Sequence, residues 1–169
     1  LVFTEDESMS TKVTRNDFVH SWMDVYGYDE TGSYNYEEYG LLYSEDKRRL
    51  LRCSMQITDC TVREGTKVIC DSAFSDKNIV SVQIPESVIT IGEEAFYHCP
   101  GLESISIPEG VNVIGDYAFM NYHQLTTIHL PQSLNMIGDG VSTGCNRLLG
   151  IYIPKGFKSI SDKLLPEYK

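Results

Sequence analysis

The sequence predicts a β-dominated solenoid in which each rung, one turn of about 23 residues, holds one short strand and one short helical turn. Two repeating patterns predict this fold class. The pattern I-G-x-x-A-F occurs at residues 91–96 and 114–119, with degraded copies at residues 69–74 and 137–142. Self-similarity at a fixed period of roughly 20 to 50 residues is typical of solenoids. An aliphatic residue followed by proline also recurs every 23 residues, at Ile84-Pro85, Ile107-Pro108, Leu130-Pro131 and Ile153-Pro154.

The strand of each rung is a short alternating run. In the copy Leu102-Glu103-Ser104-Ile105-Ser106-Ile107, the leucine and the isoleucines face inward and the two serines face outward. This is the period of a short, half-buried strand. Pro108 ends the strand because proline has no N–H to donate to a neighbouring strand. We therefore expect each rung to add one strand to a continuous sheet.

The second half of the rung is predicted to turn back toward the core. Val111 and Ile114 face inward, and Gly115 is expected in a tight-turn conformation that a side chain would penalise. Ala118 is small, which lets a short helical turn lie close to its neighbour. The phenylalanine that follows has the largest apolar area of the rung. The phenylalanines at this position are expected to stack on one another: Phe74, Phe96 and Phe119.

These residues resemble the BspA-like leucine-rich repeats, whose rung reads roughly L-x-x-I-x-I-P-x-x-V-x-x-I-G-x-x-A-F-x-x-C. The resemblance covers about residues 43–169. It implies a leucine-rich-repeat solenoid in a surface or secreted interaction protein, typically bacterial, with no catalytic residues to carry over. The family has no common ligand. The matching residues include Leu102, Ile105, Ile107, Pro108, Val111, Ile114, Gly115, Ala118 and Phe119, and likewise Ile84, Pro85, Val88, Ile91, Gly92, Ala95, Phe96 and Cys99.

Residues 1–40 do not repeat, and they are predicted to form an acidic, tyrosine-rich lead-in and a small cap. Residues 1–14 are either a flexible lead-in or a remnant of a preceding segment. A short helix starting at Asn16 or Asp17 is predicted to cap the open end of the solenoid. The tyrosine-rich residues 27–39 are predicted to be a loop, with a sugar or protein contact surface as the alternative. The repeat domain is predicted over residues 41–169, with a hairpin at residues 40–52, rungs from residue 57 and a C-terminal cap at residues 161–169.

The cap is predicted from the place where the repeat fails. Ser142 stands where a fourth stacking phenylalanine would be, so the stack is expected to end at Phe119. One rung further on, Leu165 falls at the aromatic position. We therefore expect Leu164 and Leu165 to fold over the final rung and to close its apolar side.

The chain has 169 residues and a formal net charge of −10, which is concentrated near its start. Residues 1–46 hold eleven acidic residues against Lys12 and Arg15, a net charge of −9, whereas residues 47–169 hold 13 acidic and 12 basic residues. Neither part offers the basic stripe that nucleic acids or anionic membranes bind. No run approaches the roughly 20 apolar residues of a membrane span. We expect no nucleic-acid partner, no membrane span and no signal segment within this sequence.

No motif predicts catalysis, a metal site or a cofactor, so we expect a protein that is not an enzyme. The four histidines fall at different rung positions. The sequence contains no H-x-x-x-H, no C-x-x-C and no nucleophile or phosphate-binding motif. The five cysteines give no disulfide framework, since Cys99 and Cys145 share one rung position two repeats apart, beyond disulfide reach. The sequence leaves open whether a disulfide joins Cys53 to Cys60.

We predict a non-enzymatic module, secreted or on the cell surface, that binds a protein or glycan through the outward side chains of its strands. His129 and Tyr152 have enough surface to anchor a partner. The alternative is a structural spacer, or a subunit of a larger surface assembly whose contacts are made by the acidic N-terminal region. The oligomeric state stays open. The candidate binding residues are Ser81, Gln83, Ser104, Ser106, Thr127, His129 and Tyr152.

Overall fold

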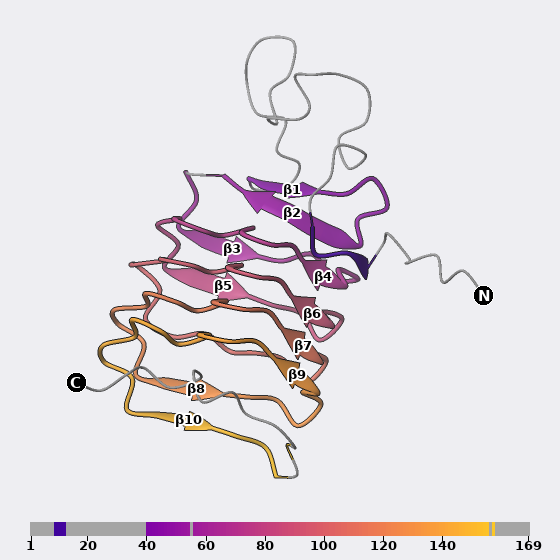
Figure 1. Ribbon diagram of the computed structural model, residues 1–169. Helices are drawn as coiled ribbons and strands as arrows, with labels where there is room; N and C mark the ends of the chain where they lie inside the picture. Colours follow the sequence, from indigo (N-terminus) through magenta and orange to yellow (C-terminus); the bar gives the residue numbers. More distant parts are fainter. Residues whose placement is uncertain (1–8, 13–39, 55, 156, 158–169) are drawn as a thin grey trace.

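The computed structural model describes residues 9–12, 40–54, 56–155 and 157, which form a β-solenoid of about five rungs (Figure 1). Each rung lies beside the next along the solenoid axis, so that equivalent positions form columns. The strands of the described residues, in chain order, are β1 (Leu41–Tyr43), β2 (Arg49–Cys53), β3 (Asp59–Thr61), β4 (Val68–Ile69), β5 (Ser81–Gln83), β6 (Thr90–Ile91), β7 (Val113–Ile114), β8 (Thr127–His129), β9 (Met136–Ile137) and β10 (Gly150–Tyr152).

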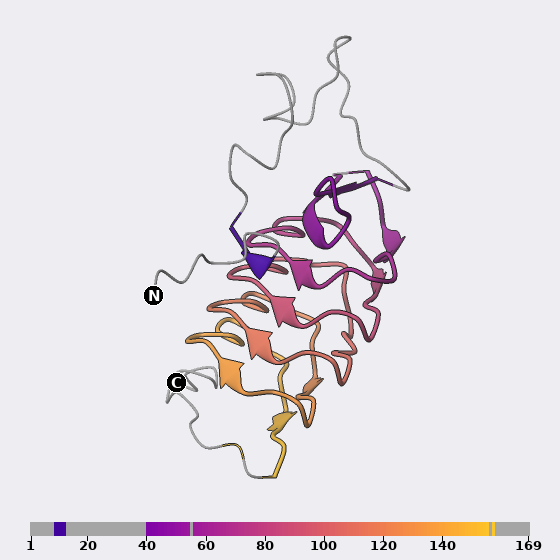
Figure 2. The ribbon, with the colours of Figure 1, turned by 90° about the vertical axis from the view of Figure 1, so that its right-hand side faces the viewer.

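The largest sheet follows the solenoid from end to end, in the order β1-β2-β4-β6-β7-β9. β1 and β2 pair antiparallel as a hairpin, and the other strands pair in parallel, one rung apart. Seen from the side, these strands form a single stack (Figure 2). Because the register follows the repeat, one isoleucine per rung falls in the same inward column: Ile69, Ile91, Ile114 and Ile137.

The alternating strands form two separate pairs rather than a continuous sheet. β3 pairs with β5, and β8 pairs with β10, both in parallel. Residues 104–106 occupy the equivalent position in the middle rung and keep the predicted alternation, since Ile105 is buried and Ser104 exposed. They form no strand, because their backbone makes no hydrogen bond to β5 or β8. The expectation of a strand in every rung is therefore wrong for this rung.

The helical turn predicted for each rung is absent from the described residues, and tight turns take its place. In residues 71–76, Ser72 and Asp76 have φ angles of 56° and 57°, which an α-helix does not allow. The backbone N–H groups of Ser72, Phe74 and Asp76 donate to carbonyl oxygens of the next rung, at 2.7–2.9 Å. A helix would use these groups within its own segment. The turns of consecutive rungs are thus joined by backbone hydrogen bonds, and they form a third side of the solenoid beside the two strand-bearing sides.

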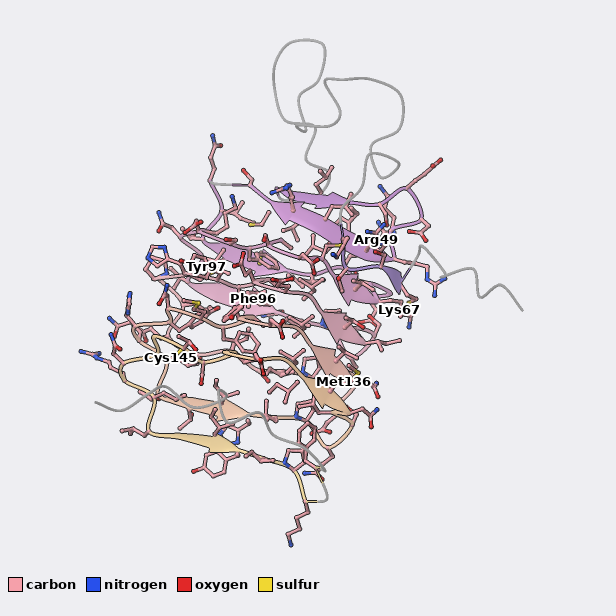
Figure 3. The ribbon with its side chains drawn as sticks, viewed as in Figure 1. Arg49, Lys67, Phe96, Tyr97, Met136 and Cys145 are labelled. Carbon is pink, nitrogen blue, oxygen red and sulfur yellow. The ribbon has the colours of Figure 1, made fainter. Side chains whose placement is uncertain are left out.

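The phenylalanine stack is present in the core. The ring centroids of Phe74 and Phe96 lie 4.7 Å apart with an interplanar angle of 7°, and those of Phe96 and Phe119 lie 5.9 Å apart at 27°. All three rings are fully buried, and Phe96 lies inside the solenoid in Figure 3. The residue before each ring is a buried alanine, which lets the turn approach the core closely.

Gly115 is needed for a reason that differs from the predicted one. Its φ is not in the left-handed region, so the expected tight-turn conformation is wrong. A Cβ on Gly115 would lie 2.6 Å from the backbone nitrogen of Glu93 and 2.7 Å from the carbonyl carbon of Gly92. Gly138 has the same surroundings one rung further on, 2.4 Å from the backbone nitrogen of Asp116. Glycine here lets the backbones of consecutive rungs come into contact.

Residues 9–12 lie against the N-terminal end of the largest sheet (Figures 1 and 2). The buried Arg49 holds them there, because its Nε donates to the carbonyl of Ser10 at 2.8 Å and its Nη2 to the carbonyl of Lys12 at 2.5 Å. These four residues of the predicted lead-in are therefore docked on the solenoid. Met9, the first residue of this segment, packs on a small apolar cluster formed by Leu42, Leu51, Val68 and Cys70.

Three further predictions lie outside the described residues: the helix from Asn16 or Asp17, the loop at residues 27–39 and the cap with Leu164 and Leu165. The cysteines are all buried and free, so no bridge joins Cys53 to Cys60. Within the part of the chain that the structure describes, no helix has the length and hydrophobicity to cross a membrane.

Candidate binding face

The candidate residues lie on the strand face, which we define as the outward-facing side chains of β3, β5, residues 104–106, β8 and β10. Within each strand pair the register is parallel, so residues 22 or 23 apart in sequence lie side by side. The face therefore has an N-terminal part, a middle rung and a C-terminal part. The predicted residues are distributed over these parts as Ser81 and Gln83, then Ser104 and Ser106, then Thr127, His129 and Tyr152.

The N-terminal part of the strand face is polar and joined by side-chain hydrogen bonds. The Ser81 hydroxyl donates to the Asp59 carboxylate at 2.6 Å, and the Thr61 hydroxyl donates to the side-chain oxygen of Gln83 at 3.4 Å. Hydrogen bonds from Ser81 and Thr58 lower the pKa of Asp59, which favours its charged form. The repeat pattern did not predict Asp59 and Thr61, because their rung lacks the proline signature. Their offset of 22 residues from Ser81 and Gln83 is the signal that would have found them.

The C-terminal part of the strand face carries an aromatic pair. The rings of His129 and Tyr152 stack with their centroids 4.3 Å apart and an interplanar angle of 7°. The pairing of β8 with β10 sets these two residues directly opposite each other, so the stack follows from the strand register. Tyr152 is 60% exposed and His129 is exposed as well. The pair thus offers a flat aromatic surface with a polar hydroxyl at its edge.

More apolar surface is exposed at the same end of the solenoid. Leu149 and Ile153, on either side of β10, are 85% and 40% exposed. Met136 on β9 is 64% exposed, and Figure 3 shows it near the C-terminal end of the largest sheet. β9 and β10 are the last strands of their sheets among the described residues. The β1–β2 hairpin closes the opposite end of the largest sheet, so the two ends differ in chemistry.

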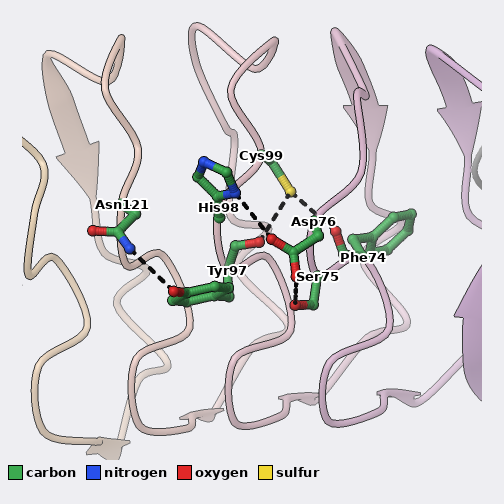
Figure 4. Close-up of polar contacts among 7 residues, drawn as sticks. All are labelled: Phe74, Ser75, Asp76, Tyr97, His98, Cys99 and Asn121. Atoms are coloured by element: carbon green, nitrogen blue, oxygen red, sulfur yellow. Dashed lines mark hydrogen bonds and ion pairs between the residues drawn. The ribbon is translucent and has the colours of Figure 1, made fainter.

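A second polar group lies on the turn side of the solenoid (Figure 4). His98 Nδ1 lies 2.9 Å from Asp76 Oδ1, and the His123 ring stands edge-on to His98 with centroids 6.2 Å apart. The side chains of His98 and Asp76 are 45% and 62% exposed, so their interaction is well solvated and weak. Among the described residues, no group of three or more histidine, cysteine, aspartate or glutamate side chains is arranged to hold a metal ion.

Comparison with known proteins identifies the repeat. A model of the BspA type leucine-rich repeat region matches residues 48–167 in six copies. None of the curated proteins matches the chain. The crystal structure of the pneumococcal vaccine antigen PcpA is similar, with a TM-score of 0.62 and 23% identity over 70% of this chain and 34% of that one.

Two leucine-rich repeat proteins from Bacteroides are also similar. The protein from Bacteroides ovatus has a TM-score of 0.61 and 22% identity over 73% of this chain and 34% of its own. The protein from Bacteroides capillosus has a TM-score of 0.56 and 24% identity over 69% of this chain and 96% of its own. At these identities the similarity shows the fold alone. The chain spans about a third of the length of PcpA and of the Bacteroides ovatus protein.

Proposed function

The chain belongs to the BspA-type leucine-rich repeat family, and from this membership we propose that it is a binding module, secreted or on the cell surface, that recognises a protein or glycan through its strand face. Repeats with this fold are typically non-enzymatic interaction modules. A solenoid suits the role because it holds outward side chains at a fixed spacing over an extended surface. The near neutrality of residues 47–169 favours such partners over nucleic acid.

The stacked pair of His129 and Tyr152 is the observation that carries the proposal. Residues that dominate binding energy are commonly aromatic side chains that a partner covers completely. Both rings are already held by their mutual stack and by the pairing of β8 with β10, so binding would restrict them little further. The neighbouring residues on the same face are small, Thr127 and Gly150, which leaves a partner room to approach the rings.

The test begins with a partner captured from extracellular material and then purified, so that its affinity for the chain can be measured. Replacing both aromatic residues, His129→Ser with Tyr152→Ser, is expected to weaken binding at least about 30-fold, as for a residue pair that dominates an interface. The matched control is His123→Ser with Tyr117→Ser, the same two residue types on the turn side, which should leave the affinity unchanged. Equal affinities of the first variant and the parent would contradict the proposal.

The second candidate function is a structural spacer or a subunit of a larger surface assembly. The exposed Leu149 and Ile153 beside the edge strand β10 favour it, because an apolar strand edge is a surface on which another chain can pair. A subunit that assembles through this edge should self-associate in analytical ultracentrifugation, and the variant Leu149→Glu should abolish the association. A binding module without assembly predicts a monomer at all concentrations, and loss of partner binding only in the aromatic variant.

The compartment is tested separately from the partner. An antibody raised against the chain should label intact cells of the source organism, or should detect the protein in the medium after the cells are removed. Labelling that appears only after the cells are broken would contradict the proposed location and leave the measured affinity untouched.

A further inference from the structure

The strand face is interrupted in its middle. Residues 103–107, which we call the seam, lie between β5 and β8 and make no backbone hydrogen bond to any described residue. In Figure 1 the middle rung passes between β5 and β8 without a strand arrow. Ser104 and Ser106 are exposed, so solvent can reach the backbone of the seam and satisfy its polar groups. The sequence of the seam is the most regular alternation in the chain, so the interruption is not a failure of the repeat.

The other two sides of the same rungs are bonded without interruption. In the largest sheet, β6 pairs with β7 and β7 with β9, and the Gly115 N–H donates to the Ile91 carbonyl at 2.9 Å. On the turn side, the Phe96 N–H donates to the Ala118 carbonyl at 3.0 Å. Consecutive rungs here are hydrogen-bonded to each other on two of their three sides and not on the third. One rung can therefore tilt relative to the next, with the two bonded sides as the axis.

The phenylalanine stack gives a second, independent observation. Phe74 and Phe96 belong to the rungs of β3 and β5, which are paired on the strand face, and their rings are 4.7 Å apart and nearly parallel at 7°. Phe119 belongs to the middle rung, and its ring lies 5.9 Å from Phe96 at 27°. The ring spacing is therefore shorter across the boundary where the strand face is bonded and longer across the boundary where the seam begins, although all three rings stay buried.

Side-chain contacts across the strand face follow the same division. Ser81 is bonded to Asp59 across the paired boundary between β3 and β5, and His129 stacks on Tyr152 across the paired boundary between β8 and β10. No such contact joins Ser104 or Ser106 to a described side chain in either neighbouring rung. The face thus consists of two bonded plates on either side of the seam.

We propose that the solenoid has a hinge at the rungs next to the seam. The plate of β3 and β5 and the plate of β8 and β10 rock relative to each other, with the largest sheet and the turn side as the axis and the seam as the side that opens and closes. This motion lets the strand face change its curvature, so that the polar plate and the aromatic plate can adjust to one surface. The hinge is a property of the free protein and does not depend on the proposed binding function. Loops and element ends that lack backbone bonds are where such motions concentrate.

The first experiment measures nitrogen relaxation dispersion on the full chain, which detects motion on the microsecond to millisecond scale. The expected result is dispersion at the amides of residues 103–107, with flat profiles at Ile91 and Ile114 in the largest sheet. Flat profiles at the seam would overturn the proposal. Dispersion on all three sides of the boundary would overturn it as well, because whole rungs would then be separating.

The second experiment closes one boundary of the seam with a disulfide. The pair Gln83→Cys with Ser106→Cys links β5 to the middle rung, and its oxidation is expected to change the dispersion at residues 103–107, because the seam must then move together with β5. The control pair, Thr61→Cys with Gln83→Cys, spans the boundary that β3 and β5 already pair, and its oxidation should leave the dispersion unchanged. Dispersion at residues 103–107 that is unchanged when the first pair is oxidised would overturn the hinge, whatever partner the strand face binds.

Discussion

At the scale of single residues, Tyr122 departs from the repeat on both sides of it. Cys99 lies 23 residues before it and Cys145 lies 23 residues after it, so a phenol ring takes the place that a thiol has in the neighbouring rungs. The ring stands edge-on to Phe119 with centroids 6.2 Å apart and is fully buried. Its hydroxyl has no hydrogen-bond partner of standard geometry among the described residues. Burial, reinforced by the nearby Cys99 thiol, raises the pKa of Tyr122 well above its ordinary value.

The ring of Tyr122 should therefore matter more than its hydroxyl. Tyr122→Phe removes a buried hydroxyl without a partner, and we expect stability to stay the same or to rise by up to about 1 kcal/mol. Tyr122→Cys matches the residue type of the column but leaves a cavity, and we expect a loss of about 2–4 kcal/mol. Urea denaturation of the two variants measures both changes. A loss in the phenylalanine variant as large as that in the cysteine variant would show that the hydroxyl is bonded.

The second prediction at this scale concerns the glycines that allow backbone contact. Gly115→Ala places a methyl group against the backbone of Glu93 and Gly92, which cannot move aside as a side chain can, and we expect a loss of about 3 kcal/mol. Gly150→Ala is the control, because nothing lies within 4 Å of its added Cβ. A change within about 0.5 kcal/mol is expected there. Thermal melts compare the two, and equal stability would mean that the rungs can move apart at Gly115.

At the scale of elements, the columns could be predicted and the turns could not. Inward isoleucines, small alanines and stacked phenylalanines follow from the period and from side-chain size, both of which the sequence contains. The φ angles of Ser72, Glu94, Tyr117 and Gly140 are positive at one rung position, and only the fourth copy has the glycine that would have marked it. The outward positions of the candidate site follow from alternation. The seam depends on the spacing between backbones, which side-chain type does not determine.

The docking of residues 9–12 could not be predicted from the sequence either, because Arg49 donates to backbone carbonyls, which every residue has. It leads to a prediction at the element scale. Deleting residues 1–12 exposes the apolar cluster under Met9 and removes two hydrogen-bond acceptors of the buried Arg49. A hydrogen bond to a charged group such as this guanidinium contributes roughly 1.5–3 kcal/mol. We expect the melting temperature to fall by several degrees.

The matched control for that deletion removes residues 1–8 only, which leaves the bonded segment in place and should melt close to the parent. A deletion of residues 1–12 that melts with the parent would show that the contacts of Arg49 contribute nothing net. The variant Arg49→Met, which keeps the length of the side chain without its donors, should reproduce most of the loss.

At the scale of the whole molecule, the buried thiols link stability to pH. Burial raises the pKa of Cys53 and Cys60 to about 12, and that of Cys99 and Cys145 to about 11, from an ordinary value of 9.0. A group that holds its proton more tightly when folded adds stability below its unfolded pKa and loses it as the pH rises. We expect stability to be constant from pH 7 to 9 and to fall between pH 9 and 12.

Thiol labelling checks the same burial directly. At pH 8 the folded chain should leave all five cysteines unmodified by a thiol reagent, and unfolding in urea should make all five reactive. Rapid modification of the folded chain at pH 8 would mean that the rungs open far enough to admit the reagent. A stability that stays constant up to pH 12 would contradict the raised pKa values of the thiols.

The bonding of one rung to the next also fixes how the molecule responds to force. Among the described residues, backbone hydrogen bonds join each rung to the next, so a pull on the two ends of the solenoid would separate the rungs one at a time. Each event would release 23 residues, about 80 Å of chain at roughly 3.5 Å per residue. A chain tethered at both ends through this fold would lengthen in small, repeated steps under tension, and would act as an extensible connector rather than as a rigid rod.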